Sequence, residues 1–336
     1  MTITPAYEKD LTNLDELDAH ASAAEVVTWN GRRALRLTNG LVVMPGLEVA
    51  DGSVGVQIGA EAPAYPGIAF RIADALNYEL AYAQPHTSGL WDALQYDPVF
   101  HGSNTWQLYH GRAYQKQAVV PTGEWFSLRV DVKGDRAAFT IGDQPPLVVG
   151  RLAHRQKAGL VGIWSFQPAY FSDFRVSACQ AFPDSGWHYP AAPAGVVGEW
   201  FLEGFGTVEC EPSGILNLNR YLPLALGEVR LVRWFEVLSS EAVEFAFGFS
   251  DELSLQFGDQ IVFTGRNTYA SMRNRPDRGY VDSDMHVIRP ALAPGTHRLT
   301  ATLKVTEPFG WGLILSAREG RVRFLPANKG GPSSDA

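Results

Sequence analysis

Cysteine is scarce in this sequence. Only 2 of 336 residues are cysteine, so a chain of this length is expected to bury its core without a disulfide framework. Cys179 and Cys210 have no Cys-x-x-Cys or Cys/His spacing, which gives no support for structural zinc. Two unpaired thiols suit a reducing compartment, and the N-terminus lacks the basic start and apolar stretch of a secretory signal. We therefore expect a cytoplasmic protein.

Long apolar runs and basic clusters are also absent. No apolar stretch approaches 18 residues, which excludes a membrane helix. The 28 Lys and Arg are outnumbered by 36 Asp and Glu, and no block of five or six cations exists to attract a phosphate backbone. Hydrophobic residues make up 46% and charged residues 19%, which excludes wholesale disorder. We expect a soluble globular protein with neither nucleic acid nor membrane as a partner, and the oligomeric state stays open.

Helical periodicity is nearly absent. Only residues 11–24 place leucines (Leu11, Leu14 and Leu17) at helix-like spacing, and that stretch is short. Apolar side chains instead alternate with period 2 in short runs bounded by turn residues, at Val54–Ile58, Ile68–Ile72, Tyr78–Tyr82 and Phe126–Val132. These runs predict an all-β protein built from antiparallel β-sandwiches.

A proline-rich stretch divides the chain. Pro183, Pro190 and Pro193 remove backbone donors that a strand needs, and short strand-like runs resume after them. The clearest later signal is Leu253–Phe257 followed by Gly258-Asp259 and then Ile261–Phe263, which predicts a tight hairpin. We predict two jelly-roll sandwiches in tandem: an N-terminal extension (1–24), a first sandwich (25–180), a linker (181–198), a second sandwich (199–326) and a disordered tail (327–336).

Several stretches carry a family resemblance. YPGIAFRIADALNYELAYAQPH, GEWFSLRVDVKGDRAAFTIGDQPPLVV and AGLVGIWSF together resemble the concanavalin A-like lectin/glucanase superfamily, with its laminin-G-like and glycoside-hydrolase branches, over roughly residues 25–178. FGFSDELSLQFGDQIVFTGRNTY with PFGWGLILSA resembles a galactose-binding-like jelly roll. The resemblance rests on strand rhythm, including the strand Trp125–Val132, so it implies a fold and a carbohydrate ligand class and not a particular activity.

Catalytic and metal motifs are missing. The family 16 glucanases of this superfamily carry two Glu flanking an Asp on one strand, and no Glu-x-Asp-x-Glu or Glu-x-Asp-x-x-Glu occurs here, so that pair of carboxylates is not supplied. Neither Gly-x-Ser-x-Gly nor a phosphate-binding glycine loop is present. No His-x-His or His-x-x-x-His pair supports a metal. We expect no cofactor; Ca²⁺ held by loop oxygens, as in laminin-G-like domains, stays an alternative without a motif.

Two neighbouring strands bring a charged pair together. If the strands pair through residues 73–77, then Arg71 faces Glu79 and Ala69 faces Ala81. A charged pair among alanines predicts a concave, solvent-filled surface, on which Glu79 is the best-placed candidate for a general acid or base. The alternative is an ordinary cross-strand ion pair with a small effect on stability.

The loop that follows, residues 85–111, is unusually polar and aromatic. It holds three of the eight histidines, beside rings and hydrogen-bonding side chains of the kind that a sugar requires. Alternatively, single members satisfy a turn or cover the sandwich edge. We predict catalytic roles for Glu79, His86, His101 and His110. We predict substrate binding by Arg71, Asp92, Gln95, Tyr96, Asn104, Trp106, Gln107 and Tyr109.

These residues favour a protein that acts on or binds a small glycoside or oligosaccharide in the concave cleft of the first sandwich by acid/base chemistry, as a glycoside hydrolase or lyase. Two alternatives are a noncatalytic carbohydrate-binding protein and a module that offers its surfaces to another protein. A fourth, ranked last, is a sandwich that shapes a hydrophobic substrate for cyclisation.

Overall fold

The computed structural model describes residues 7–179, 181–239, 242–272 and 278–328, and strands dominate throughout. The all-β prediction is confirmed. Contacts divide the chain into two compact units, one made of Met1–Gly102 with Tyr109–Tyr189, the other of Ser103–Leu108 with Pro190–Ala336. The sandwich boundaries given above stay predictions, and the C-terminal part of the predicted tail lies outside the described residues. No helix in the described part of the chain is long and apolar enough to cross a membrane.

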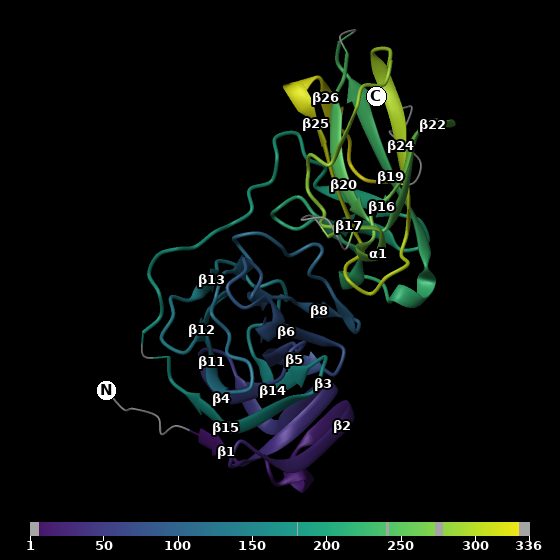
Figure 1. The fold of residues 1–336 in the computed structure, drawn as a ribbon. Coiled ribbons are helices and arrows are strands. Elements are labelled where there is room, and N and C mark those ends of the chain that lie inside the picture. Colours follow the sequence, from purple (N-terminus) through teal and green to yellow (C-terminus); the bar gives the residue numbers. More distant parts are fainter. Residues whose placement is uncertain (1–6, 180, 240–241, 273–277, 329–336) are drawn as a thin grey trace. The chain divides into compact units, whose positions relative to one another are not determined.

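The first unit is one long antiparallel sheet, drawn in purple to teal in Figure 1. Its main path runs β10-β7-β6-β5-β14-β3-β15-β4-β11-β12-β13. The period-2 runs in the sequence fall on β4, β5, β6 and β11, which confirms those strands. The bounds are β1 Tyr7–Lys9, β2 Asp18–Trp29, β3 Arg32–Val49, β4 Gly52–Ala60, β5 Pro66–Asp74, β6 Asn77–Ala83, β7 Leu94–Tyr96, β8 Val99–Phe100, β10 Gln115–Lys116, β11 Trp125–Lys133, β12 Arg136–Ile141, β13 Leu147–Val149, β14 Gly159–Ser165 and β15 Ala169–Ser177. The short strand β9, Ser103–Asn104, lies in the segment that belongs to the second unit.

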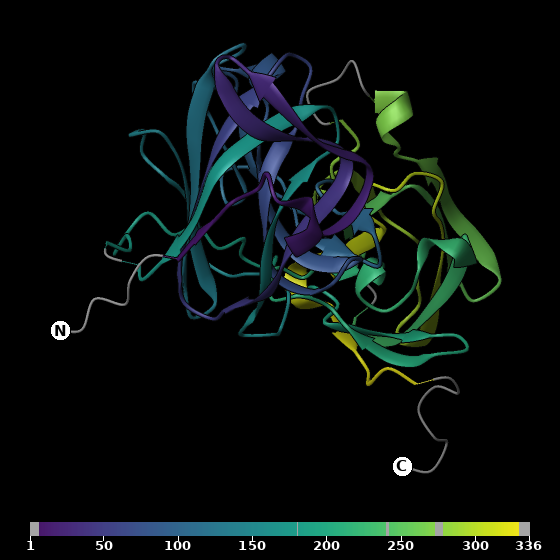
Figure 2. The ribbon, with the colours of Figure 1, turned by 90° about the horizontal axis from the view of Figure 1, so that it is seen from below.

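Figure 2 shows the curved strands of the first unit in purple to teal, and contacts of β7 with β13 show that the two ends of the sheet path approach each other. Phe70 on β5 and Tyr96 on β7 each lie 6.0 Å, between ring centroids, from Phe139 on β12, although these strands stand far apart along the path. Rings contributed by distant strands fill the space that the curled sheet encloses, and each buried ring stabilises it by about 2 kcal/mol. The two end strands, β10 and β13, therefore leave a seam.

The N-terminal stretch joins this sheet. Residues 11–24, where leucine spacing hints at a helix, contain only a 3-10 turn at Leu14–Glu16 before β2 begins at Asp18. β1 pairs with β15, and β2 forms a long hairpin with β3. Backbone pairing with existing strands outweighs the weak local helix signal of so short a run.

The predicted register of β5 and β6 is wrong by one residue. Phe70 lies opposite Glu79, and Ile68 lies opposite Ala81. The ladder is interrupted between Phe70 and Asp74, and Arg71 within the interruption has a φ of +47°. A bulge adds a residue to one strand only, so a register counted from the loop cannot foresee it.

The second unit is a sandwich of two sheets. One runs β17-β16-β19-β24-β21-β22, with β26 also pairing β19, and the other runs β18-β25-β20-β23. The bounds are β16 Glu199–Leu202, β17 Gly206–Glu209, β18 Leu216–Asn217, β19 Glu228–Val237, β20 Phe245–Ser250, β21 Glu252–Phe257, β22 Gln260–Arg266, α1 Tyr269–Met272, β23 His286–Ile288, β24 Gly295–Lys304, β25 Gly312–Ala317 and β26 Val322–Phe324, with 3-10 turns at Leu218–Arg220, Leu224–Leu226 and Arg318–Gly320.

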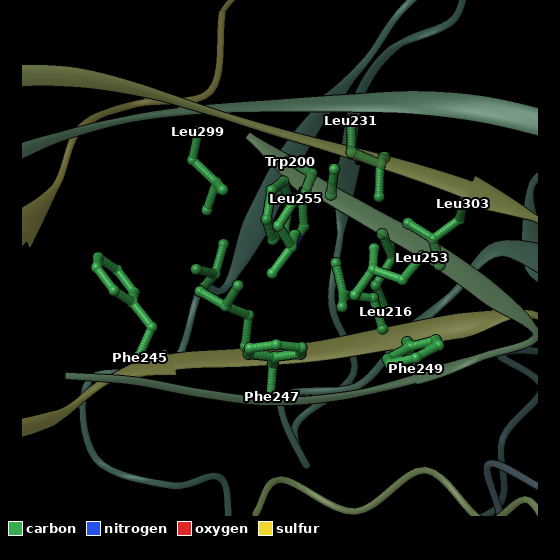
Figure 3. Close-up of a cluster of buried hydrophobic side chains, with 14 of the residues drawn as sticks. Trp200, Leu216, Leu231, Phe245, Phe247, Phe249, Leu253, Leu255, Leu299 and Leu303 are labelled. Carbon is green, nitrogen blue, oxygen red and sulfur yellow. The ribbon is translucent and has the colours of Figure 1, made fainter. Parts of the chain in front are cut away.

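Alternation builds the core between these two sheets. Figure 3 shows Phe245, Phe247 and Phe249 of β20 turned toward leucines of the opposite sheet. The residues between them are small, and a Cβ at Gly248 would lie 2.0 Å from the carbonyl oxygen of Asp282. The large residues of β20 face the opposite sheet, and the small residues on its other face allow the backbone near Asp282 to approach closely.

The hairpin expected near Gly258 is confirmed. β21 and β22 pair with Leu255 opposite Phe263 and Phe257 opposite Gln260. Gly258 has a φ of +58°, a left-handed conformation that glycine adopts without a steric penalty.

Candidate functional site

Glu79 lies in the interior of the first unit. Its side chain is 0% exposed, and its carboxylate accepts hydrogen bonds from the Tyr96 hydroxyl (2.6 Å) and the His154 backbone N–H (2.9 Å). Tyr96 in turn accepts the Ala153 N–H at 2.7 Å. Burial, followed by the charge of Glu79, raises the pKa of the Tyr96 phenol well above its usual range, so the phenol remains a donor.

Arg71 completes this buried polar group. It is 2% exposed, and its guanidinium donates to the carbonyl of Gly134 and, at 3.4 Å, to those of Gln156 and Ala50. Burial is the main cause that lowers its pKa, and the charge of Glu79 opposes that shift. The predicted solvent-filled hollow around Arg71 and Glu79 is therefore absent. A general acid must reach the bond that it protonates, so this burial argues against the catalytic role expected of Glu79.

The three candidate histidines are not gathered around Glu79. The ring of His86, which follows the end of β6, packs against Tyr65 with centroids 4.6 Å apart. The backbone N–H of His101 donates to Asn77, at the start of β6. His86 and His101 therefore lie at opposite ends of one strand. His110 is half-buried and lies between β9 and β10 in the chain. The described hydrogen bonds of the Glu79 carboxylate come from Tyr96 and the His154 backbone and involve none of these three imidazoles.

Three predicted binding residues belong to the second unit. Asn104, Trp106 and Gln107 lie within Ser103–Leu108, which packs as part of that unit. The backbone N–H of Gln107 donates to Phe309 and its carbonyl accepts from Val281, both at 3.0 Å, while its side-chain oxygen accepts from Ser250. The 85–111 loop is therefore not one wall of one site.

The Trp106 ring sits among aromatic residues of the second unit. Its centroid lies 5.4 to 5.7 Å from those of Tyr269, Tyr280 and Phe309. Trp106 is half-buried, and an indole held against three other rings packs as part of the second unit, which fits the packing alternative that the sequence left open for single members of the loop.

The remaining predicted binders are interior residues of the first unit. Asp92, Gln95 and Tyr109 are each no more than 3% exposed. Gln95 accepts a hydrogen bond from Gln84 at 3.3 Å, and Tyr109 packs edge-on against Tyr96. These polar side chains therefore make contacts within the loop, below the protein surface.

A groove opens where the two ends of the curled sheet meet, and we call it the seam groove. Its volume is about 550 Å³, within the range of about 300 to 1,000 Å³ that is usual for small-molecule sites. Its lining combines an indole, two cations, two amides and an imidazole with small and aliphatic residues: Trp91, Gly111, Arg112, Gln115, Lys116, Gln117, Pro146, Leu147, Val148, Gly186 and His188.

The seam groove is built from both end strands of the sheet path. Gln115 and Lys116 form β10, Leu147 and Val148 belong to β13, and His188 is held beside β13 by a backbone bridge to Val149. Strands that end a sheet path lack a neighbour on one side, so a hollow can form between them.

Backbone bonds fix the turn that carries Trp91. The Gly89 N–H donates to Ala118 at 2.8 Å, and the Gln117 amide donates to the Gly89 carbonyl at 2.7 Å. Trp91 is 42% exposed although its turn is pinned. A half-exposed indole on a restrained turn offers a flat apolar face to a ligand at little entropic cost.

The turn that carries Arg112 is restrained as well. The Gly111 N–H donates to the Gln115 side-chain oxygen, and the Gly111 carbonyl accepts from the backbones of Tyr114 and Gln115, all within 2.9 Å. Gly111 has a φ of +73°, which favours glycine. The sequence analysis missed four residues of this groove: Arg112, Lys116, Gln117 and His188. The first three follow the polar loop and the last falls in the predicted linker. Only the approach of β10 to β13 brings them together.

The described residues offer no cluster of metal ligands. Among the described residues, no group of three or more His, Cys, Asp or Glu is placed to hold a metal ion. Cys179 and Cys210 are free thiols.

The sequence matches no known family model and no curated protein. Solved structures resemble parts of it at low identity. A carbohydrate-binding module from Bacillus subtilis is 12% identical and covers 48% of this chain and 96% of its own, with a TM-score of 0.38. A Bacillus subtilis protein of unknown function with a galectin-like fold is 10% identical over 52% and 97%, with a TM-score of 0.39. A native glycosidic hydrolase is 9% identical over 55% and 100%, with a TM-score of 0.37. Likeness at this level assigns no activity.

Proposed function

We propose that this protein binds a carbohydrate in the seam groove without cleaving it. The observation that carries the proposal is the half-exposed indole of Trp91 beside amide, guanidinium and ammonium groups in one groove. A sugar ring has an apolar face of C–H bonds and an edge of hydroxyl groups. It is therefore matched by an aromatic face surrounded by directional donors and acceptors.

The composition of the groove favours binding over hydrolysis. Acid/base cleavage of a glycoside uses a pair of carboxyl groups, and among the described residues that line the seam groove none is Asp or Glu. The carboxylate expected to act, Glu79, is buried and held by Tyr96 and His154. The noncatalytic alternative of the sequence analysis thus has more structural support than the enzymatic one.

Replacement of Trp91 tests the proposal. We expect Trp91→Ala to weaken glycan binding at least fivefold, because loss of stacking on an aromatic ring costs about 1 to 3 kcal/mol. Binding is measured by screening the protein on a broad glycan microarray, followed by calorimetric titration with the glycans that give signals.

The matched control is Phe166→Ala, which removes a ring that is 51% exposed and lies outside the groove lining. This variant should bind as the parent does. Equal binding by Trp91→Ala, or an absence of binding across the array, would exclude the seam groove as a carbohydrate site. Release of shorter sugars on prolonged incubation with the parent protein would contradict the noncatalytic part of the proposal.

A further inference from the structure

The seam groove differs in charge from the rest of the molecule. The chain has a formal net charge of −8, yet the charged side chains that line this groove are Arg112 and Lys116. Two other surface grooves of the first unit contain carboxylates: one has Glu8, Asp10 and Asp173 in its lining, and the other has Asp131, Asp143 and Asp184. Of these three grooves, the seam groove is the one lined by cations without carboxylates.

Neither Arg112 nor Lys116 is neutralised within the described structure. No carboxylate of the described residues lies within ion-pair distance of either, whereas Arg129, in the lining of another groove, is paired with Asp131 at 2.9 Å. Glu124, the carboxyl group nearest along the chain, is exposed and is not part of the lining. The positive charge of the groove is therefore available to a ligand.

A buried amide adds to the excess of donors. Gln95 lies directly opposite Gln115 in the pairing of β7 and β10, so their side chains share a face of the sheet. The side-chain nitrogen of Gln95 is buried without a hydrogen-bond partner, next to a residue that lines the groove. An unsatisfied buried N–H group costs about 1 to 3 kcal/mol, so the packing behind the groove lacks an acceptor for this donor.

From these observations we propose that the ligand of the seam groove is an acidic saccharide, whose carboxylate or sulfate groups are bound by Arg112 and Lys116 while a sugar ring stacks on Trp91. This inference rests on the carbohydrate-binding function proposed above. A guanidinium presents parallel N–H donors that fit two oxygens of a planar or tetrahedral anion, and an ammonium adds a point charge.

The experiment compares saccharides of similar length that differ in charge. Tetragalacturonate and its methyl ester share size and stereochemistry, and a sulfated tetrasaccharide and a neutral cello-oligosaccharide extend the series. Each is titrated calorimetrically into the full-length protein at 50 and 300 mM NaCl. We expect the acidic members to bind at least tenfold more tightly than the neutral ones, with a difference that shrinks at high salt because screening weakens charge attraction.

The variants locate that difference. Arg112→Ala with Lys116→Ala should remove the preference for acidic saccharides and leave the weaker binding of neutral ones, whereas Lys133→Ala, which removes an exposed cation outside the groove lining, should change neither. Preference for tetragalacturonate over the sulfated saccharide would identify carboxylate as the anion, and the reverse would identify sulfate.

Two results overturn the inference in distinguishable ways. Trp91-dependent binding that is equal or tighter for neutral saccharides would refute the acidic preference while leaving the carbohydrate-binding proposal standing. Absence of binding by every member of the series and by the array would refute both.

Discussion

Tyr96 connects the buried polar groups of the first unit. Its hydroxyl donates to Glu79 and accepts from the backbone of Ala153, and its ring stacks near Tyr114 and Phe139. Glu79 is therefore held as an acceptor inside the curled sheet, with Arg71 supplying positive charge nearby. A polar group that is satisfied in this way helps to fix one arrangement of the core, because any other would leave a charge unpaired.

Removal of the Tyr96 hydroxyl should destabilise this arrangement. Tyr96→Phe keeps the ring but removes one hydrogen bond to the Glu79 carboxylate and one from the Ala153 N–H, so we expect the free energy of unfolding to fall by about 1 to 3 kcal/mol. Urea unfolding measures this change in the free energy of unfolding. Tyr189→Phe is the control, since that side chain is 57% exposed, and it should change stability by less than about 0.5 kcal/mol. Equal stability of the two variants would show that the Tyr96 bonds contribute nothing net.

The polar loop of residues 85–111 contains elements with separate tasks. Its first turn presents Trp91 at the surface, its middle strand β7 builds the core of the first unit, and Ser103–Leu108 packs within the second unit. A long loop can thus be rich in aromatic and polar residues because parts of it are packed as core, and composition alone does not separate those parts from a binding surface.

Two tryptophans of this loop should respond oppositely to replacement. Trp106→Ala removes a ring packed against Tyr269, Tyr280 and Phe309, and we expect it to lower the free energy of unfolding of the second unit by about 3 kcal/mol without altering glycan binding. Trp91→Ala should leave stability within about 0.5 kcal/mol of the parent and weaken glycan binding at least fivefold. Differential scanning calorimetry measures the stability of each variant, and calorimetric titration measures its glycan binding. A stable Trp106→Ala variant would mean that this ring is not core.

At the scale of the whole molecule, contacts between distant parts of the sequence decide how the second unit responds to acid. Glu199 on β16 accepts hydrogen bonds from the Ala327 backbone and from Arg233 on β19, each at 2.9 Å. The Ala327 N–H first, and then Arg233, lower the pKa of the Glu199 carboxyl below 4.5. Because the folded-state pKa is depressed, this stabilisation is fully present above pH 4.5 and is lost as the pH falls through the folded-state pKa.

Glu199→Gln should therefore reduce the loss of stability on acidification below about pH 4.5. Thermal unfolding is followed from pH 3 to pH 7, with Glu228→Gln as the control because Glu228 is exposed at the start of β19. The control should keep the acid sensitivity of the parent. A parent-like pH profile for Glu199→Gln would rule out this carboxylate as a source of acid sensitivity.

The sequence by itself determined the fold class and many strands. Period-2 runs give β4, β5, β6 and β11, and the Gly258 turn gives a hairpin, because alternation and turn residues act over a few residues at a time. Only the tertiary structure decided where side chains ended up. The bulge at Arg71 changed which residues face each other, and the curl of the sheet placed Glu79 inside. The same curl brought β10 and β13 together around Trp91, Arg112 and Lys116. Burial and groove formation depend on which distant strands close against one another, and the local pattern of a strand carries no record of its distant neighbours.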